Sequence, residues 1–185
     1  MKKTSFILSL LLSFSLSVLG QNTFTLTSTD LGGQVTKEQE FNGFGCTGKN
    51  HSPQLSWKNA PKETKSFAVT MYDPDAPTGS GWWHWVIFDI PANTSTIAGN
   101  AGDVNLNLLP KGAIQSVTDF GSKGYGGPCP PEGHGDHQYI ITVYALKTEK
   151  LGLNENTNPA VVGYYLWSNA IAKASIVSYY KRDKK

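Results

Sequence analysis

The sequence predicts one domain with an all-β dominated fold and few helices. Its 185 residues include nineteen Gly and ten Pro, which divide the chain into short segments, as turn-rich β proteins require. Several segments rich in β-branched and aromatic residues are typical of strands, whereas one segment alone carries strong helix signals. A chain of this length can bury a hydrophobic core without depending on disulfides.

Four segments predict strands. Residues 24–28 alternate apolar and polar side chains, which indicates an edge strand, and residues 66–72 (SFAVTMY) indicate a second strand. Residues 83–90 (WHWVIFDI) are apolar on both faces, which predicts a central strand buried on both sides. Residues 138–146 (QYIITVYAL) complete the set.

A C-terminal helix is predicted over residues 160–180. Asn158 is a favourable N-cap and Pro159 suits the first helical position. Apolar residues then recur at three- and four-residue steps, which predicts one face packed on the sheet. These apolar residues are Val162, Leu166, Ala170, Ala174 and Val177. The aromatic residues of the segment are expected to pack rather than to bind a ligand; they are Tyr164, Tyr165 and Trp167.

Residues 1–20 have the pattern of a secretory signal peptide. A basic start precedes an apolar run over residues 6–19, and Gly20 suits a cleavage site. The run is shorter than the roughly 20 residues of a membrane span. We therefore expect residues 21–185 to form one domain that is periplasmic or secreted.

The charge distribution argues against nucleic-acid binding. Removing the two lysines of the leader lowers the formal net charge from +2 to zero. Residues 181–185 carry +3, so residues 21–180 carry about −3. The body of the protein has no basic stripe of the kind that nucleic-acid binding requires.

The two cysteines, Cys46 and Cys129, lie in Gly- and Pro-rich segments rather than in predicted strands. In an oxidising compartment this placement favours a disulfide over two separate buried thiols. Closing a loop of 83 residues would contribute about 4–5 kcal/mol of stability. The spacing does not match a zinc site.

Two acidic residues follow the strand predicted at residues 66–72. Asp73 and Asp75 belong to an Asp-Pro-Asp-Ala-Pro turn that ends at Pro77. Each proline fixes its own φ and keeps the preceding residue extended, so two carboxylates are held on a stiff turn. Such carboxylates are costly unless they meet hydrogen-bond donors.

Two histidines are candidate ligand residues, of which His137 ends the second of two long loops predicted at residues 29–52 and 99–137. Strand alternation places His84 on the same face as Trp82, Val86 and Phe88, where a single histidine is usually a core residue. His137 and Tyr139 are two residues apart on a strand and share a face, so an imidazole N–H and a phenol O–H suit an anion. The preceding glycines would let main-chain N–H groups approach a ligand closely.

Four hypotheses account for these groups, in order of preference. The first is a pocket where His84, His137, Tyr139 and main-chain N–H groups hold a phosphate-like anion, while the aspartates orient the imidazole rings or bind a cationic amine. The second is turn chemistry without function. The third is a metal site of His134, Asp136 and His137, whose spacing matches no standard motif. The fourth is a hydrolase, for which no nucleophile signature is present.

Several motifs in order resemble the phosphatidylethanolamine-binding protein family, also called Raf-kinase-inhibitor-like. They are Asp-Pro-Asp-Ala-Pro at residues 73–77, Trp-x-His ending at His84, and Gly-Pro-x-Pro-Pro-x-Gly-x-x-x-His-x-Tyr at residues 127–139. Residues 44–57 and the short gap at residues 78–81 are similar to the bacterial YbhB/YbcL type. The resemblance covers nearly all of the chain after the leader.

The resemblance implies an antiparallel β-sandwich with a few peripheral helices over residues 24–180. It implies a small pocket for phosphate or phosphoethanolamine-type groups, with no catalytic activity, cofactor or metal. The residues implied to line this pocket are Asp73, Asp75, Pro77, His84, Gly127, Pro128, His137 and Tyr139.

The sequence therefore predicts an exported, non-enzymatic protein that binds a small anion. One alternative is a protein–protein inhibitor of the kinase- or protease-inhibitor type that uses the pocket rim. A second alternative is an enzyme acting on a phosphorylated or acylated small substrate. The leader argues against inhibition of a cytosolic kinase, as does the short segment at residues 78–83, which is longer and more charged in eukaryotic members.

Overall fold

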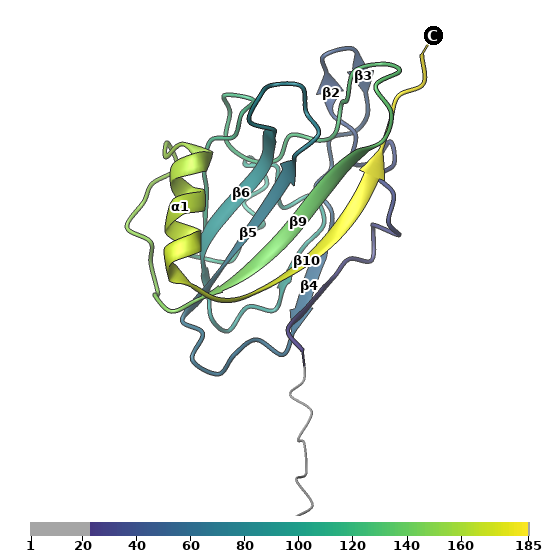
Figure 1. Ribbon diagram of the computed structural model, residues 1–185. Helices are drawn as coiled ribbons and strands as arrows, with labels where there is room; N and C mark the ends of the chain where they lie inside the picture. Colours follow the sequence, from purple (N-terminus) through teal and green to yellow (C-terminus); the bar gives the residue numbers. More distant parts are fainter. Residues whose placement is uncertain (1–22, 185) are drawn as a thin grey trace, which may run out of the picture.

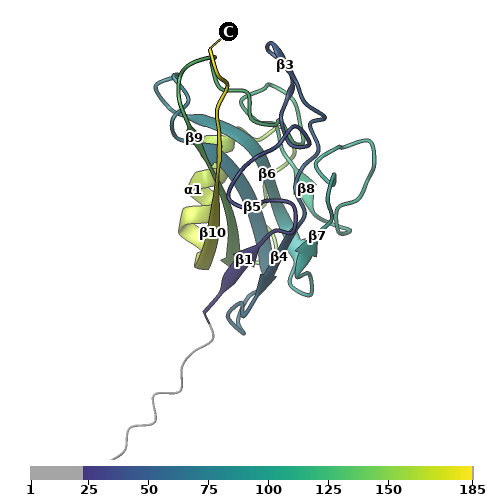
Figure 2. The same ribbon diagram turned by 90° about the vertical axis from the view of Figure 1, so that its right-hand side faces the viewer.

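The structure is a computed structural model that describes residues 23–184, so the predicted signal peptide lies outside the described residues. Its centre is a five-stranded antiparallel sheet in the order β10-β9-β5-β6-β8. The strands of this sheet are β5 (Ser66–Asp73), β6 (Trp82–Pro91), β8 (Ile114–Gln115), β9 (His137–Leu146) and β10 (Ala170–Tyr180). A smaller sheet covers one face and helix α1 covers the other, giving three layers (Figure 1, Figure 2).

The outer layers consist of short elements. The smaller sheet contains β1 (Thr25–Thr27), β4 (Leu55–Lys58) and β7 (Thr96–Ile97), and a separate hairpin contains β2 (Asn42–Gly43) and β3 (Cys46–Thr47). Helix α1 spans Pro159–Asn169 and is the only α-helix in residues 23–184. No helix in this part of the chain has both the length and the apolar character needed to cross a membrane.

Two hydrophobic clusters join the layers. The larger lies between the two sheets and includes Trp57 of β4, Met71 of β5 and Trp85 of β6. The smaller lies under α1 and brings Val162 of the helix against Phe88 of β6. Because both faces of β5 and β6 are covered, their sequences are mostly apolar instead of alternating.

The predicted fold class and the four predicted strands are confirmed. The segments 24–28, 66–72, 83–90 and 138–146 form β1, β5, β6 and β9, with ends that move by one residue or two. β1 is an edge strand, and β6 is buried on both sides. The long loops at residues 29–52 and 99–137 contain only very short strands before β9 begins, namely β2, β3 and β8.

The predicted helix over residues 160–180 is wrong beyond Asn169. Its start is as expected, because the Asn158 side chain accepts a hydrogen bond from the Ala160 main-chain N–H at 2.9 Å. After the helix the chain forms β10, which pairs with β9 along its length. From residue 172 to residue 180 even-numbered residues turn inward and odd-numbered residues are exposed. This two-residue period is a strand pattern, and the three- and four-residue spacing of small apolar residues had hidden it.

The helix aromatic residues also differ from expectation. They were expected to pack, but Tyr164 is 64% exposed and Trp167 is 78% exposed. A helix of eleven residues has three turns, and one apolar stripe is enough to cover the sheet. That stripe is formed by Pro159, Val162 and Leu166.

A bulge in β6 reverses the expected direction of His84. Met71 pairs with Trp85 while Tyr72 pairs with Trp83, so His84 is an extra residue in the strand. The predicted face shared with Val86 and Phe88 is therefore wrong, because those two residues pack under α1. His84 instead faces Tyr139 across the other side of the sheet, with 5.2 Å between ring centroids.

Candidate functional site

A pocket lies at one end of the five-stranded sheet, where β5 ends and β6 and β9 begin. Because these neighbours run antiparallel, Asp73 at the end of β5 lies beside Trp82 at the start of β6, and β9 begins with His137. The pocket has a volume of about 180 Å³. It can hold a phosphate-sized group and is smaller than typical sites for drug-sized ligands.

The pocket has a polar floor and an apolar rim. The floor consists of four buried residues, namely Asp73, His84, His137 and Tyr139. The rim consists of apolar residues, namely Phe44, Trp82, Phe120, Pro130 and Pro131, of which all but the buried Pro130 are at least partly exposed. The remaining lining residues are Ala76, Pro77, Thr78 and Cys129.

Asp73 orients His137. Its Oδ2 accepts a hydrogen bond from His137 Nδ1 at 2.8 Å, and its Oδ1 accepts one from the Asp75 main-chain N–H at 2.8 Å. The other ring nitrogen of His137, Nε2, lies 2.7 Å from Nδ1 of His134. Protein groups therefore engage both nitrogens of His137, the imidazole that the sequence assigned to an anion.

The main chain of Gly126 orients His84. His84 Nδ1 lies 2.6 Å from the Gly126 carbonyl oxygen, and the Gly126 N–H donates to the His84 carbonyl at 2.9 Å. A carbonyl oxygen only accepts, so the hydrogen resides on Nδ1. Burial lowers the pKa of His84 to about 4, while the Gly126 carbonyl and the Asp73 carboxylate act in the opposite direction. The ring is neutral at pH 7, so its Nε2 is a hydrogen-bond acceptor.

The Tyr139 hydroxyl is buried and, although the Asp73 carboxylate lies near it, it makes no hydrogen bond of normal geometry within residues 23–184. Burial raises the pKa of this phenol, and the nearby Asp73 carboxylate raises it further, so the hydroxyl keeps its hydrogen. Leaving a buried polar group without a partner costs about 1–3 kcal/mol. A ligand oxygen in the pocket would remove that cost.

Asp75 links two strands from outside the pocket. Its Oδ2 accepts a hydrogen bond from the Gln138 main-chain N–H at 2.8 Å, which ties the turn after β5 to the start of β9. The same turn places Ala76, Pro77 and Thr78 in the pocket wall, whereas Asp75 itself does not line the pocket.

Gly127 and Pro128 stand behind the pocket wall. The Gly127 N–H donates to Asn50 Oδ1 at 2.7 Å, and the Pro128 carbonyl accepts from the Phe41 N–H at 3.0 Å. A Cβ at Gly127 would overlap the carbonyl oxygen of Gln39. The glycine is needed for close packing, and its N–H is used within the protein rather than presented to a ligand.

Aromatic residues that the sequence did not identify form much of the rim. Phe120 stacks with Phe44 at 5.9 Å between ring centroids and meets Trp82 edge to face at 5.5 Å. Phe44 is 71% exposed. The available signal was an aromatic residue between two glycines, Gly43 and Gly45, in a loop.

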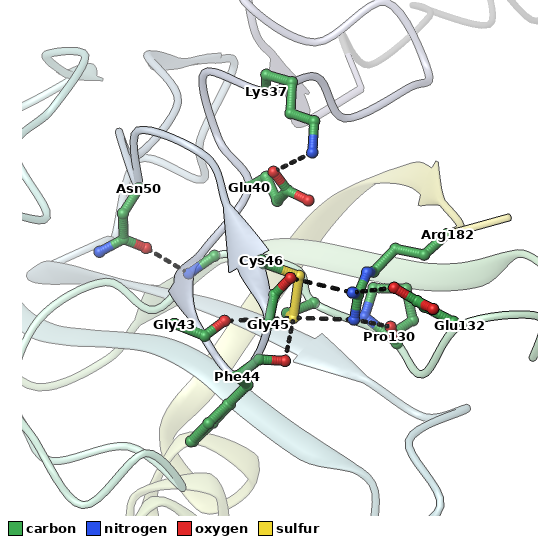
Figure 3. The surroundings of a disulfide bond; sticks show 12 residues. Lys37, Glu40, Gly43, Phe44, Gly45, Cys46, Asn50, Pro130, Glu132 and Arg182 are labelled. Atoms are coloured by element: carbon green, nitrogen blue, oxygen red, sulfur yellow. Dashed lines mark hydrogen bonds and ion pairs between the residues drawn. A yellow bond between two sulfur atoms is a disulfide. The ribbon is translucent and has the colours of Figure 1, made fainter. Parts of the chain in front are cut away.

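A disulfide joins two parts of the rim. Cys46 lies in the hairpin that carries Phe44, and its partner Cys129 directly precedes Pro130 (Figure 3). The cross-link therefore connects residues that are far apart in the sequence at the mouth of the pocket.

Arg182 braces the same two segments. Its guanidinium donates hydrogen bonds to the carbonyl of Gly45 at 3.1 Å and to the carbonyl of Pro130 at 3.3 Å (Figure 3). It also pairs with Glu132 at 2.7 Å. This part of the basic C-terminal segment thus supports the rim.

Five of the eight residues assigned to the pocket from the sequence line it; they are Asp73, Pro77, His84, His137 and Tyr139. The structure places Asp75, Gly127 and Pro128 behind the wall, where they hold neighbouring segments together. The sequence thus located the pocket but did not separate lining residues from supporting ones.

The metal hypothesis finds no support in the described residues. No group of three or more His, Cys, Asp or Glu side chains within residues 23–184 could hold a metal ion. His134 and His137 are joined directly to each other instead.

Comparison with known proteins identifies relatives over most of the chain. Residues 28–181 match the model of a family described as phosphatidylethanolamine-binding protein. The UPF0098 protein YbcL of Escherichia coli (strain K12) is 50% identical over 160 residues, which are 85% of this chain and 87% of that protein. The UPF0098 protein YbhB of the same strain is 45% identical and covers 84% of this chain and 98% of the relative.

The fold is also similar to a solved structure. The crystal structure of E. coli YbcL, described as a new member of the mammalian PEBP family, superposes with a TM-score of 0.84 at 50% identity. The match covers 85% of this chain and 98% of the YbcL chain. The similarity therefore spans most of this chain and nearly all of the YbcL chain.

Proposed function

The chain belongs to the phosphatidylethanolamine-binding protein family, and from that premise we propose that its pocket binds a small oxyacid group such as phosphate or phosphoethanolamine. The observation that carries the proposal is the buried Tyr139 hydroxyl, a donor without a partner beside the floor of the pocket. An oxygen of the ligand would accept this hydrogen bond. The small volume and the apolar rim suit a compact head group whose remainder extends outward.

An NMR titration of residues 21–185 tests the proposal. We expect saturable amide shifts on adding inorganic phosphate or O-phosphoethanolamine, concentrated at the ends of β5, β6 and β9. Tighter binding of O-phosphoethanolamine would indicate that the amine is also recognised. If neither compound produces a saturable shift up to millimolar concentration, the proposal is wrong.

A matched pair of variants tests the role of Tyr139. Tyr139→Phe removes only the hydroxyl, and we expect phosphate affinity to fall about 10- to 100-fold, as for loss of a hydrogen bond to a charged group. Tyr144→Phe makes the same change on β9, in the cluster on the opposite face under α1. It should leave affinity unchanged. Equal affinities for the two variants would show that the Tyr139 hydroxyl does not contact the ligand.

We propose binding without turnover. Neither hydroxyl of the described lining is an activated nucleophile, because burial raises the pKa of the Tyr139 phenol and the Thr78 hydroxyl donates to the Gly81 carbonyl. Incubation of the protein with O-phosphoethanolamine, followed by ³¹P NMR, should show an unchanged ligand. Release of inorganic phosphate that is lost in Tyr139→Phe would instead indicate an enzyme.

We also propose that the protein acts outside the cytoplasm. Residues 1–20 supply the motivation, and a Cys46–Cys129 disulfide suits an oxidising compartment. Mass spectrometry of the protein from periplasmic and extracellular fractions should find a chain that begins at Gln21. Recovery of the full-length chain from the cytoplasm alone would contradict this localisation.

A second candidate function is docking of a protein partner on the rim. The observation in its favour is Phe44, a large apolar residue that is mostly exposed at the pocket mouth. A partner that covers the rim should be retained by the wild-type protein and lost by Phe44→Ser. Retention by both proteins would place the contact elsewhere.

A further inference from the structure

The hydrogen positions in the pocket determine which form of an oxyacid it can accept. His84 Nδ1 donates to the Gly126 carbonyl, so in the neutral ring Nε2 has a lone pair and no hydrogen. The Gly127 main chain also lies near the His84 ring and raises its pKa, but the one hydrogen bond of the ring within residues 23–184 is that of Nδ1, and Nε2 is not one of their buried unpartnered atoms. Since His84 lines the pocket, Nε2 is the ring nitrogen that is available to a ligand there.

His137 does not supply the missing donor. Its Nδ1–H is directed at the Asp73 carboxylate, so in the neutral ring Nε2 is an acceptor, and the His134 Nδ1 that lies beside it is the donor. Both nitrogens of His137 are engaged, and neither offers a hydrogen to the pocket. The Tyr139 hydroxyl is left as the one unpartnered donor that we find on the described floor.

The charge of the floor adds a second restriction. Asp73 places a carboxylate in the pocket, and none of the described lining residues is a lysine or an arginine. A dianion would meet this like charge beside buried side chains, where charge–charge interactions are stronger than in water. It would also meet the lone pair of His84 Nε2. The dianion is therefore disfavoured both by the Asp73 carboxylate and by the lone pair of His84 Nε2.

We propose that the pocket selects oxyacids that still carry a hydrogen on oxygen, such as the monoanion of a phosphate monoester. The P–O–H group donates to His84 Nε2, and another phosphate oxygen accepts from the Tyr139 hydroxyl. This inference rests on the proposed function and defines the ligand form for that site. No covalent bond is made or broken.

The selection has a pH signature. The titratable groups that face His84 are Asp73 on β5 and His137 and Tyr139 on β9, with His134 behind His137. Burial lowers the pKa of His84 to about 4, so the ring stays neutral while a phosphate monoester loses its second proton near pH ~6. As the pH rises above ~6 the hydrogen-bearing form becomes scarce and apparent affinity falls. As the pH falls toward 4 the ring gains a proton on Nε2, and hydrogen-free anions become acceptable.

The decisive comparison uses methyl phosphate and methyl sulfate. At pH 5.5 both are monoanions of nearly the same shape, but only methyl phosphate carries a hydrogen on oxygen. In NMR titrations of the wild-type domain we expect methyl phosphate to bind at least about tenfold more tightly. Between pH 5.5 and pH 7.5 its apparent affinity should fall about 25-fold, as the monoanion fraction does for a second pKa of about 6.

Proton uptake supplies a second readout. Calorimetry of methyl phosphate binding at pH 7.5, in two buffers with different heats of ionisation, should show close to one proton taken up per ligand. The His84→Gln variant can turn an amide N–H₂ toward the ligand. In this variant the affinities for methyl phosphate and methyl sulfate at pH 5.5 should therefore lie within about threefold of each other.

The outcomes separate this inference from the proposed function. Equal binding of methyl phosphate and methyl sulfate at pH 5.5, or uptake of no proton at pH 7.5, would overturn the inference and leave oxyacid binding intact. Binding of ethylammonium in preference to methyl phosphate would overturn both, because the pocket would then be a cation site. Absence of saturable binding by either methyl ester would also overturn both.

Discussion

The two sides of the pocket floor use the same residue type differently. On the β9 side, His137 has both nitrogens engaged, one by Asp73 and one by His134. On the β6 side, the Gly126 carbonyl engages one nitrogen of His84 and leaves the other for the pocket. The partners of each histidine therefore determine its role. His137 is held by Asp73 and His134, whereas His84 has one nitrogen available to a ligand.

This difference follows from the strands that carry the two residues. His137 is the first residue of β9 and lies beside the end of β5, so Asp73 reaches its ring from the neighbouring strand. His84 lies in a bulge of β6, which turns its ring to the face where the Gly126 segment passes. The local twist that a bulge introduces therefore gives the pocket its accessible acceptor.

The largest expected effect comes from breaking the β9 side. Asp73→Ala leaves two buried donors without an acceptor, the Nδ1–H of His137 and the main-chain N–H of Asp75. At about 1–3 kcal/mol for each group, we expect the free energy of unfolding in urea to fall by about 4 kcal/mol. The control Asp183→Ala removes an exposed carboxylate with a weak ion pair to Lys181. It should change the free energy of unfolding by less than about 0.5 kcal/mol. Similar small changes for both variants would show that the network contributes little to stability.

The next effect concerns the β6 side and depends on pH. His84 has a pKa of about 4 in the folded protein and about 6.5 in the unfolded chain, so the unfolded state binds the additional proton between these values. The neutral His84 ring therefore stabilises the folded protein fully above pH ~6.5, and this stabilisation is lost as the pH falls toward 4. Its size is about 3 kcal/mol.

A non-titrating variant isolates that contribution. Between pH 6.5 and pH 4, the free energy of unfolding of the wild-type protein should decrease by about 3 kcal/mol more than that of His84→Gln. Parallel pH profiles for the two proteins would mean that His84 is as easily protonated in the folded state as in the unfolded chain.

Some of these features could be predicted from the sequence, and others could not. The central strands were identified because burial on both faces leaves a continuous apolar sequence, as in β6. β10 was mistaken for helix because small apolar residues such as Ala170 and Ala174 fit both periods, and only pairing with β9 decides between them. The bulge at His84 depends on the register between β5 and β6, which no local pattern specifies.

The pocket, too, was predicted from the sequence only in part. The order of motifs located the pocket, and strand alternation placed His137 and Tyr139 on one face. The partners of each ring nitrogen could not be predicted, because they come from the Gly126 main chain and from His134 through the tertiary fold. The rim residue Phe44 was missed because a disulfide and a separate hairpin bring it to the pocket.

The smallest expected effect comes from His134. This residue is exposed and lies between Gly133 and Gly135, both with positive φ. His134→Ala leaves the buried Nε2 of His137 without its partner, so the free energy of unfolding should fall by about 1 kcal/mol. Methyl phosphate affinity should change by less than about threefold, because His84 keeps its partners. A loss of ligand affinity above tenfold would place the accessible nitrogen on the β9 side instead.

In the binding mode that we propose, His84 presents an unprotonated Nε2 to the pocket at neutral pH. Long-range ¹H–¹⁵N NMR of the imidazole rings in the wild-type domain at pH 7 measures this directly, with His84→Gln used to assign the signal. We expect the Nδ1–H tautomer for His84, with no sign of a charged ring until the pH approaches 4. A hydrogen on Nε2 of His84 at pH 7, in either a neutral or a charged ring, would contradict the account.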